Sequence, residues 1–378
     1  MHKEFFGFGS IQKLGELIEK YQARKIFLVT GKNSFILSGA EQKIKQHTEK
    51  IKCTQFNSFG NNPDINEVKH GISIFKKINP DLVIAVGGGS VIDMAKSVNV
   101  LSYQDGKIEE YSIGKKKLKN PGKPLIAIPT TSGTGSEVTY FATIYIDKTK
   151  YSLGDKNLTL PSISIVDPSL TESLTKYLTA STGLDALCQG IESFWAVNST
   201  KKSRKCATEA IDIAFKNIEK TVKNPDKESR LNMAKAAHLS GKAINISKTT
   251  ACHSISYPIT SYFGISHGHA VALTMPQFIE FNSQVSEKDC NDKRGVKLVK
   301  NRINEIIEIM GCKDIYDVKK KFQNLMREIR VGNKLSELNM DIKSIELIIE
   351  KGFTADRMNN NPRKVTEEAL RKILEEIL

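Results

Sequence analysis

The 378-residue sequence lacks several features that would assign it to a specialised class of protein. Its six cysteines form no CxxC pair and no regular spacing, which indicates isolated, reduced thiols, as in the cytoplasm. It contains no run of eighteen apolar residues, and its first residues lack the apolar core of a signal peptide. We therefore expect a cytoplasmic protein with no membrane partner.

The sequence is basic, with a net charge of +14, but it lacks the pattern of a nucleic-acid-binding protein. Its lysine-rich clusters are short, far apart and not interleaved with aromatic residues, so no base-stacking platform is indicated and no nucleic-acid partner is expected. We interpret the clusters as solvated faces, or as a field that attracts an anionic small substrate. The clusters are 115–119, 201–205 and 319–321.

The chain is long enough for two domains, and its pattern changes once. Up to residue 168, short apolar runs alternate with helical patterns, which predicts an α/β domain with a parallel sheet over residues 1–168. After Ser169 the strand signals largely stop, and residues 169–378 are predicted to be an all-helical domain. Strands are predicted at 25–30, 53–56, 81–86, 124–129 and 163–166, and helices at 40–50, 65–78, from 91, 180–198, 203–222, 228–245, 296–310, 315–328, 342–351 and 366–377.

Two loops that follow predicted strands carry small and hydroxyl residues. The strand at 81–86 runs into Gly87-Gly88-Gly89-Ser90 and then a helical pattern, the order that a phosphate-binding loop requires. The strand at 124–129 leads into Thr130 and a Ser/Thr/Gly-rich turn. Because ligands collect at the carboxyl ends of parallel strands, a nucleotide across this sheet edge is predicted. The alternative is a plain strand-to-helix turn, and the sequence does not match GxGxxG.

Four side chains in the helical half form a candidate metal site. Asp185 and Gln189 lie one helical turn apart and so share a face, and His253 and His267 follow in two later segments. A carboxylate, an amide oxygen and two imidazoles can enclose one divalent cation and leave positions open for water or substrate. The alternative is a polar helix face that packs against two loop histidines.

Taken together, these segments resemble the iron-containing (group III) alcohol dehydrogenases, which share a fold with dehydroquinate synthase. The motifs that carry the resemblance are 87–96, 129–139, 183–187 and the step from His253 to His267-Gly268. The resemblance covers nearly the whole chain. It implies an α/β nucleotide-binding domain followed by a helical metal domain, an NAD(P)-dependent alcohol dehydrogenase or aldehyde reductase, a small aldehyde or alcohol substrate, and a homodimer.

The resemblance implies a metal ion, Fe(II) or Zn(II), held by Asp185, Gln189, His253 and His267. The family usually has a third histidine where Gln189 stands, and an amide oxygen is a weaker ligand than imidazole. Many members also have a proton-relaying histidine where Tyr257 stands. Tyrosine can donate a hydrogen bond but is a poorer proton shuttle than histidine near neutrality, so the proton is expected to come from Tyr257, His269 or water.

The same matching implies the cofactor-binding residues. Relatives specific for NAD often have an acidic residue at the position of Gly31, whereas here Gly31 is followed by Lys32. The repulsion of a 2′-phosphate is then absent, so NADPH is favoured over NADH. The cofactor-binding residues are predicted to be Gly31, Lys32, Gly87, Gly88, Gly89, Ser90, Asp93, Thr130, Thr131, Thr134, Thr139, Lys150 and Leu178.

Residues 189–200, in which glutamine replaces histidine before an aromatic-rich stretch, are most similar to the phosphonoacetaldehyde reductase branch of this family. The substrate would then be phosphonoacetaldehyde, with Lys201, Arg204 and Arg363 as candidate partners of its anionic group. Two alternatives remain open: a non-redox lyase of the dehydroquinate synthase type, and a nucleotide-binding protein without a metal.

Overall fold

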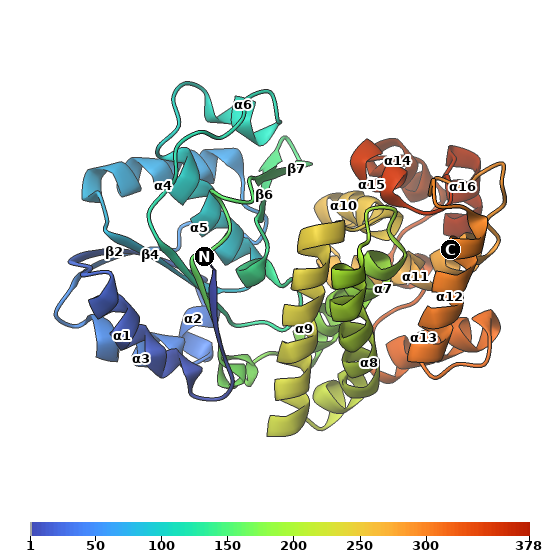
Figure 1. The fold of residues 1–378 in the computed structure, drawn as a ribbon, viewed down its shortest axis with the longest axis horizontal. Coiled ribbons are helices and arrows are strands. Elements are labelled where there is room, and N and C mark those ends of the chain that lie inside the picture. Colours follow the sequence, from blue (N-terminus) through green and yellow to red (C-terminus); the bar gives the residue numbers. More distant parts are fainter. Residues whose placement is uncertain (1) are drawn as a thin grey trace. The chain divides into compact units, whose positions relative to one another are not determined.

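The computed structural model describes residues 2–378, which divide into two compact units, residues 2–174 and 175–378 (Figure 1). The first unit contains a parallel sheet with helices, and the second unit is helical, so the predicted fold class is confirmed. The division follows Leu174, slightly beyond the boundary expected near Ser169. Among residues 2–378, no helix combines the length and the apolar character that crossing a membrane requires.

The first unit is built on a six-stranded, wholly parallel sheet with the strand order β1-β8-β5-β4-β2-β3. All five strands predicted from apolar runs are present, and β1 and the hairpin β6–β7 are additional. The strands are β1 (Lys3–Phe6), β2 (Lys25–Thr30), β3 (Lys52–Phe56), β4 (Leu82–Gly87), β5 (Leu125–Pro129), β6 (Phe141–Ile146), β7 (Thr149–Gly154) and β8 (Ile163–Val166).

Helices cover both faces of this sheet (Figure 1). Alternate residues of β2 face opposite sides: Phe27 and Val29 pack with α4 and α5, whereas Ile26 and Leu28 pack with α1 and α3. This burial on both faces explains why the strands are continuous apolar runs. The helices are α1 (Lys13–Lys20), α2 (Ser34–Leu37), α3 (Ala40–Thr48), α4 (Ile65–Ile78), α5 (Gly89–Leu101) and α6 (Ile108–Ser112), with short 3-10 turns η1 (Ser10–Gln12), η2 (Ser136–Val138) and η3 (Pro168–Thr171).

A fully buried lysine ties α5 to the loop after β5. The Lys96 ammonium donates to the carbonyl oxygens of Thr139 and Phe141, each at 2.8 Å, and to the Ser136 hydroxyl at 3.0 Å. Burial lowers the pKa of Lys96 to about 8, against the opposing charges of Asp93 and Glu137. Because a buried cation is tolerated only when it is paired and hydrogen-bonded, Lys96 fixes the course of this loop.

The second unit is a helical bundle in which α7 packs against α8, α9 and α11. All seven helices predicted there are present, within a few residues at each end. Three further helices were not predicted: α10 and α11 within residues 251–283, and the short α15 at residues 355–360. The helices are α7 (Lys176–Trp195), α8 (Lys201–Lys223), α9 (Lys227–Ser247), α10 (Ala251–Phe263), α11 (His267–Ser283), α12 (Val296–Ile309), α13 (Ile315–Glu328), α14 (Ile342–Gly352), α15 (Ala355–Asn360) and α16 (Glu367–Glu376), with the turn η4 (Ser336–Leu338).

Replacing Lys96 by methionine should destabilise the first unit. The methionine keeps most of the volume but leaves buried carbonyl oxygens without a donor, which costs about 1–3 kcal/mol. Urea unfolding measures the change, and Lys77→Met on the exposed face of α4 is the matched control. Equal unfolding free energies for the two variants would show that Lys96 does not hold the loop.

Candidate metal centre and nucleotide-binding loops

Helix α7 presents a row of buried polar side chains. The helix begins after Thr175, whose hydroxyl accepts a hydrogen bond from the Leu178 amide. Asp185, Gln189 and Glu192 follow at successive turns and are 2%, 3% and 0% exposed. Polar groups this deeply buried require partners, so this face of α7 is where a site is to be sought.

The structure brings Asp185, His253 and His267 together. Each offers a ligand atom, and these atoms lie within 4.8 Å of one another. Asp185 Oδ1 and His253 Nε2 are 3.4 Å apart, yet both are buried atoms without a hydrogen-bond partner among the described residues. Two orphaned electron-pair donors that point into one space, beside a second imidazole, fit a divalent cation.

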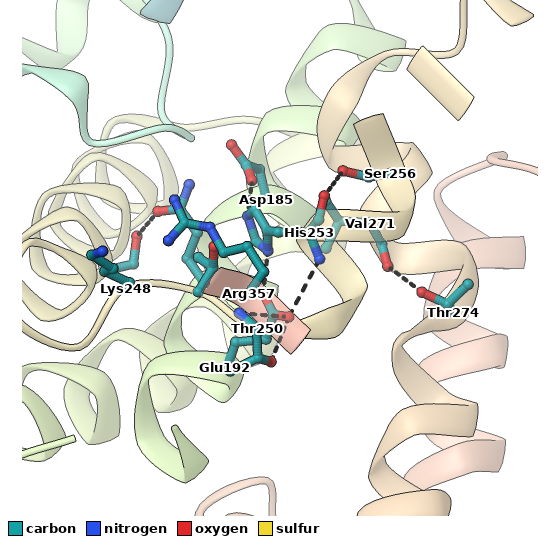
Figure 2. Close-up of polar contacts among 12 residues, drawn as sticks. Asp185, Glu192, Lys248, Thr250, His253, Ser256, Val271, Thr274 and Arg357 are labelled. Atoms are coloured by element: carbon teal, nitrogen blue, oxygen red, sulfur yellow. Dashed lines mark hydrogen bonds and ion pairs between the residues drawn. The ribbon is translucent and has the colours of Figure 1, made fainter. Parts of the chain in front are cut away.

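A second carboxylate, which the sequence analysis did not select, orients His253. Glu192 Oε2 contacts His253 Nδ1, and Glu192 Oε1 accepts hydrogen bonds from the Thr250 hydroxyl at 2.7 Å and the Thr250 amide at 3.2 Å (Figure 2). Since an ionised carboxylate can only accept a hydrogen bond, His253 Nδ1 is the donor in this contact. The other ring nitrogen of His253, Nε2, is then the one that can bind a metal ion. A histidine ligand usually donates its other ring nitrogen to such a group.

The electrostatics of the cluster favour its charged forms. Burial acts to raise the pKa of Asp185, but the contact with His253 and the charge of His267 outweigh it, so this pKa is lowered. Burial likewise opposes protonation of His253, but the Glu192 and Asp185 carboxylates raise its pKa to about 9. A cation is therefore stabilised between these carboxylates, and a metal ion competes with the proton for His253 Nε2.

Gln189 lies beside this cluster. Its side chain contacts Asp185, and its Oε1 accepts a hydrogen bond from the Ser240 hydroxyl at 3.1 Å. The amide oxygen thus has a partner within the helical unit. Ligation by Gln189 stays a prediction.

The two expected proton donors have different surroundings. The ring of Tyr257 stacks on that of His267, with centroids 6.2 Å apart and planes at 21°. His269 lies outside the three-residue cluster: its Nε2 contacts the Gly332 carbonyl oxygen at 2.7 Å, and its Nδ1 contacts the Tyr177 hydroxyl at 3.2 Å. Both nitrogens of His269 are therefore engaged by groups that hold it in place.

Gly268 lets α11 approach α7 closely enough to form the cluster. A Cβ atom at this position would lie 1.9 Å from the Ser181 carbonyl oxygen and 2.7 Å from Asp185 Cβ. His267, the first residue of α11, is brought beside Asp185 by this contact. Any side chain at position 268 would separate the two ligands.

In the first unit, the two predicted nucleotide loops lie together. Gly87 at the end of β4 pairs with Pro129 at the end of β5, and the Thr130 amide donates to the Gly87 carbonyl oxygen at 3.0 Å. A Cβ at Gly89 would lie 2.8 Å from Thr134 Cγ2, so the glycine permits close packing of the loops. Helix α5 begins at Gly89, and its first amides lie at this sheet edge, as anion binding requires.

The other predicted cofactor-binding residues lie in several places. Asp93 accepts from the Ser136 hydroxyl and the Thr143 amide, and Ser90 donates to the Asn61 carbonyl oxygen, so both hold neighbouring loops. Their part in cofactor binding stays a prediction, as it does for the remaining residues. Gly31 and exposed Lys32 follow β2, Thr131 faces Gly88, Thr139 contacts Lys96, Lys150 lies on β7, and Leu178 lies on α7 in the second unit.

The parallel-sheet unit with its two small-residue loops and the buried ligand cluster fit a metal-dependent oxidoreductase, and comparison with known proteins gives the family. The model of the iron-containing alcohol dehydrogenases matches residues 2–168, and that of the C-terminal domain of the same family matches residues 179–378. The chain therefore belongs to the iron-containing alcohol dehydrogenase family. It is an NAD(P)-dependent alcohol dehydrogenase or aldehyde reductase.

Three relatives illustrate the range of the family. The phosphonoacetaldehyde reductase of Streptomyces viridochromogenes is 32% identical over 80% of this chain and 77% of its own length. The NADPH-dependent butanol dehydrogenase of Clostridium saccharobutylicum is 30% identical over 98% and 95%. The crystal structure of sulfoacetaldehyde reductase from Bifidobacterium kashiwanohense in complex with NAD+ is 30% identical, covers 99% of this chain and 96% of its own, and superposes with a TM-score of 0.89.

Substitution of Gly268 by alanine should destabilise the helical unit and weaken metal binding. The new methyl group meets backbone atoms of α7, and overpacking of this kind costs about 1–3 kcal/mol or more. Thermal unfolding and bound metal per chain measure the two effects. Gly352→Ala is the matched control, because its Cβ would meet Ile255 and Pro258 at ordinary contact distances of 3.5 and 3.7 Å. Full metal content in Gly268→Ala would contradict this role.

Replacing Glu192 by glutamine should weaken metal binding without removing a ligand. The amide supplies less negative charge to His253, and loss of such a partner lowers metal affinity about 10–100-fold. Competition with a chromophoric chelator measures the affinity, with Glu305→Gln at an exposed position of α12 as the control. Unchanged affinity would show that Glu192 only fills the core.

Proposed function

We propose that this protein reduces phosphonoacetaldehyde to 2-hydroxyethylphosphonate with NADPH as the hydride donor. The observation that carries the catalytic part is the pair of buried, unpartnered atoms Asp185 Oδ1 and His253 Nε2 beside His267. The net charge of +14 suits an anionic substrate, and the phosphonoacetaldehyde reductase of S. viridochromogenes is among the relatives. The expected homodimer and cytoplasmic location belong to the same proposal.

The proposed ligands are Asp185, His253 and His267, with Gln189 as the fourth. When bound, an iron(II) or zinc(II) ion supplies a Lewis acid for the carbonyl oxygen, and the reduced nicotinamide supplies the hydride. Glu192 holds the His253 ring so that Nε2 faces the cluster. Asp185 contributes the negative charge that a divalent cation requires, and its lowered pKa keeps it ionised.

We assign proton donation to Tyr257. Its ring lies against that of His267, and its hydroxyl accepts a hydrogen bond from Arg357 Nε at 3.4 Å. A neighbouring guanidinium stabilises the phenolate that remains after the proton leaves. His269 is the weaker candidate because its two ring nitrogens are engaged by Gly332 and Tyr177.

The cofactor proposal rests on Gly31 and Lys32 at the end of β2. Neither provides the acidic group that would repel a 2′-phosphate, and the exposed Lys32 ammonium is available to attract one. A Cβ at Gly31 would lie 2.1 Å from Ser34 Oγ, so a larger side chain would have to displace Ser34. These features support NADPH over NADH.

The test is a panel of absorbance assays at about 340 nm with phosphonoacetaldehyde, butanal and a semialdehyde, each with NADPH or NADH. We expect the highest kcat/KM with phosphonoacetaldehyde and NADPH, and loss of at least about 100-fold in His267→Ala, because a metal ligand is gone. Tyr262→Phe is the aromatic control. Turnover that survives both His267→Ala and chelation would refute the metal role, and equal rates for all aldehydes would refute the substrate assignment.

A further inference from the structure

Arg357 is a buried cation with few partners. It lies on α15 and is 8% exposed. Its Nη1 donates to Asp356 Oδ2 at 3.2 Å and its Nε to the Tyr257 hydroxyl at 3.4 Å, both long contacts for a charged donor. A guanidinium has more N–H donors than these two bonds use, and among the described residues its Nη2 makes no hydrogen bond.

Burial acts to lower the pKa of Arg357, but Tyr257, Asp356 and Glu192 outweigh it, so this pKa is raised and the guanidinium stays charged. Its acidic partner, Asp356, is exposed and is shared with Lys248, whose Nζ lies 2.9 Å from the same oxygen. The nearby Glu192 carboxylate already accepts from Thr250 and His253. Two cations therefore share one solvent-facing carboxylate, and the charged guanidinium keeps N–H groups that can donate to an anion.

Two other arginines of the helical unit provide a comparison. Arg363 pairs with Asp289 at 2.7 Å, donates to the Phe281 carbonyl oxygen and lies over the Phe281 ring. Arg302 is more deeply buried, bonds to the Ala196 carbonyl oxygen and shares Asp292 with Arg294, and its Nε has no hydrogen-bond partner among the described residues. Arg363, which was named as an anion partner from the sequence, is thus engaged in contacts within the helical unit. Arg357, in contrast, keeps N–H groups that donate to no acceptor within residues 2–378.

Arg357 lies close to the ligand cluster. The Tyr257 hydroxyl that it contacts belongs to the ring stacked on His267, so one aromatic side chain separates the guanidinium from a proposed metal ligand. The charge of Glu192 also acts on Arg357, and Figure 2 shows both with His253 and Thr250. Tyr257 and His267 are partly exposed, whereas Asp185 and His253 are buried.

We propose that Arg357 binds the tetrahedral oxyanion of the substrate, a phosphonate or sulfonate, and thereby selects short aldehydes with an anionic end group. This inference rests on the proposed function. The guanidinium donates two parallel N–H bonds to the oxyanion, and the short carbon chain then brings the carbonyl group toward Asp185, His253 and His267. Arg357 is thus a specificity-determining residue, whereas Lys201, Arg204 and Arg363 are not required.

The experiment compares Arg357→Met and Arg357→Lys with wild type. We expect the ratio of kcat/KM for phosphonoacetaldehyde to that for butanal to fall about 100-fold in Arg357→Met, because a buried charge-assisted contact is lost. Arg357→Lys keeps the positive charge but lacks the paired N–H donors of the guanidinium, so in this variant the same ratio should fall about 10-fold. Arg371→Met on exposed α16 is the control and should keep the wild-type ratio. An unchanged ratio in Arg357→Lys or Arg357→Met would overturn the inference.

A binding measurement separates this inference from the proposed function. Phosphorus NMR titration of methylphosphonate should show binding to wild type and a loss of affinity of about 10-fold or more in Arg357→Lys, which is the variant to use if Arg357→Met does not fold. If wild type binds methylphosphonate through Arg357 but does not reduce phosphonoacetaldehyde, the substrate assignment fails and the anion site stands. If wild type reduces phosphonoacetaldehyde, but wild type and Arg357→Lys bind methylphosphonate with equal affinity, the anion site at Arg357 is refuted. Sulfoacetaldehyde and methanesulfonate in parallel show which oxyanion is preferred.

Discussion

The helical unit depends on one buried carboxylate, Glu192. A wholly buried charge is tolerated only when donors surround it, and here the Thr250 hydroxyl and amide, the His253 amide and the His253 ring all point at it. Trp195 Nε1 donates to the Thr250 hydroxyl at 3.0 Å and extends this network within α7. The network fixes the direction of His253 Nε2, and the ligand cluster follows from that direction.

Close packing of α11 against α7 sets the position of His267 in the ligand cluster. The absence of a side chain at Gly268 allows α11 to approach α7, which brings His267 beside Asp185. In the first unit the same principle joins two loops, since Gly89 packs against Thr134 and Lys96 anchors the later part of the loop. In both units a glycine contact and a buried charge together fix the positions of backbone or ligand atoms.

Much of the fold could be predicted because its signals are local. Helix α4 was bounded correctly, since apolar periodicity and the Asp64–Glu67 capping box both mark its start. Helices α10 and α11 were missed because Pro258 and Pro276 lie inside them and interrupt the pattern. The β6–β7 hairpin was missed because Asp147 and Lys148 take positive φ at its turn without the usual Asn-Gly signal.

The site was predictable only in part. Asp185, His253 and His267 were proposed as ligands from their residue types and spacing and again from the family resemblance, and the structure brings them together. Glu192 carried one local signal, its position one turn beyond Gln189 on the polar face of α7. Arg357 carried none, because its relation to Tyr257 spans a hundred residues and arises only from the packing of α15 beside α10.

The central claim is that one metal ion binds between Asp185, His253 and His267. The most direct measurement is anomalous diffraction from crystals of the metal-loaded protein, collected at the iron or zinc absorption edge. The account predicts a single strong peak at about 2.0–2.2 Å from Asp185 Oδ1, His253 Nε2 and a His267 ring nitrogen. A map without a peak there, or with the metal bound elsewhere, would contradict it.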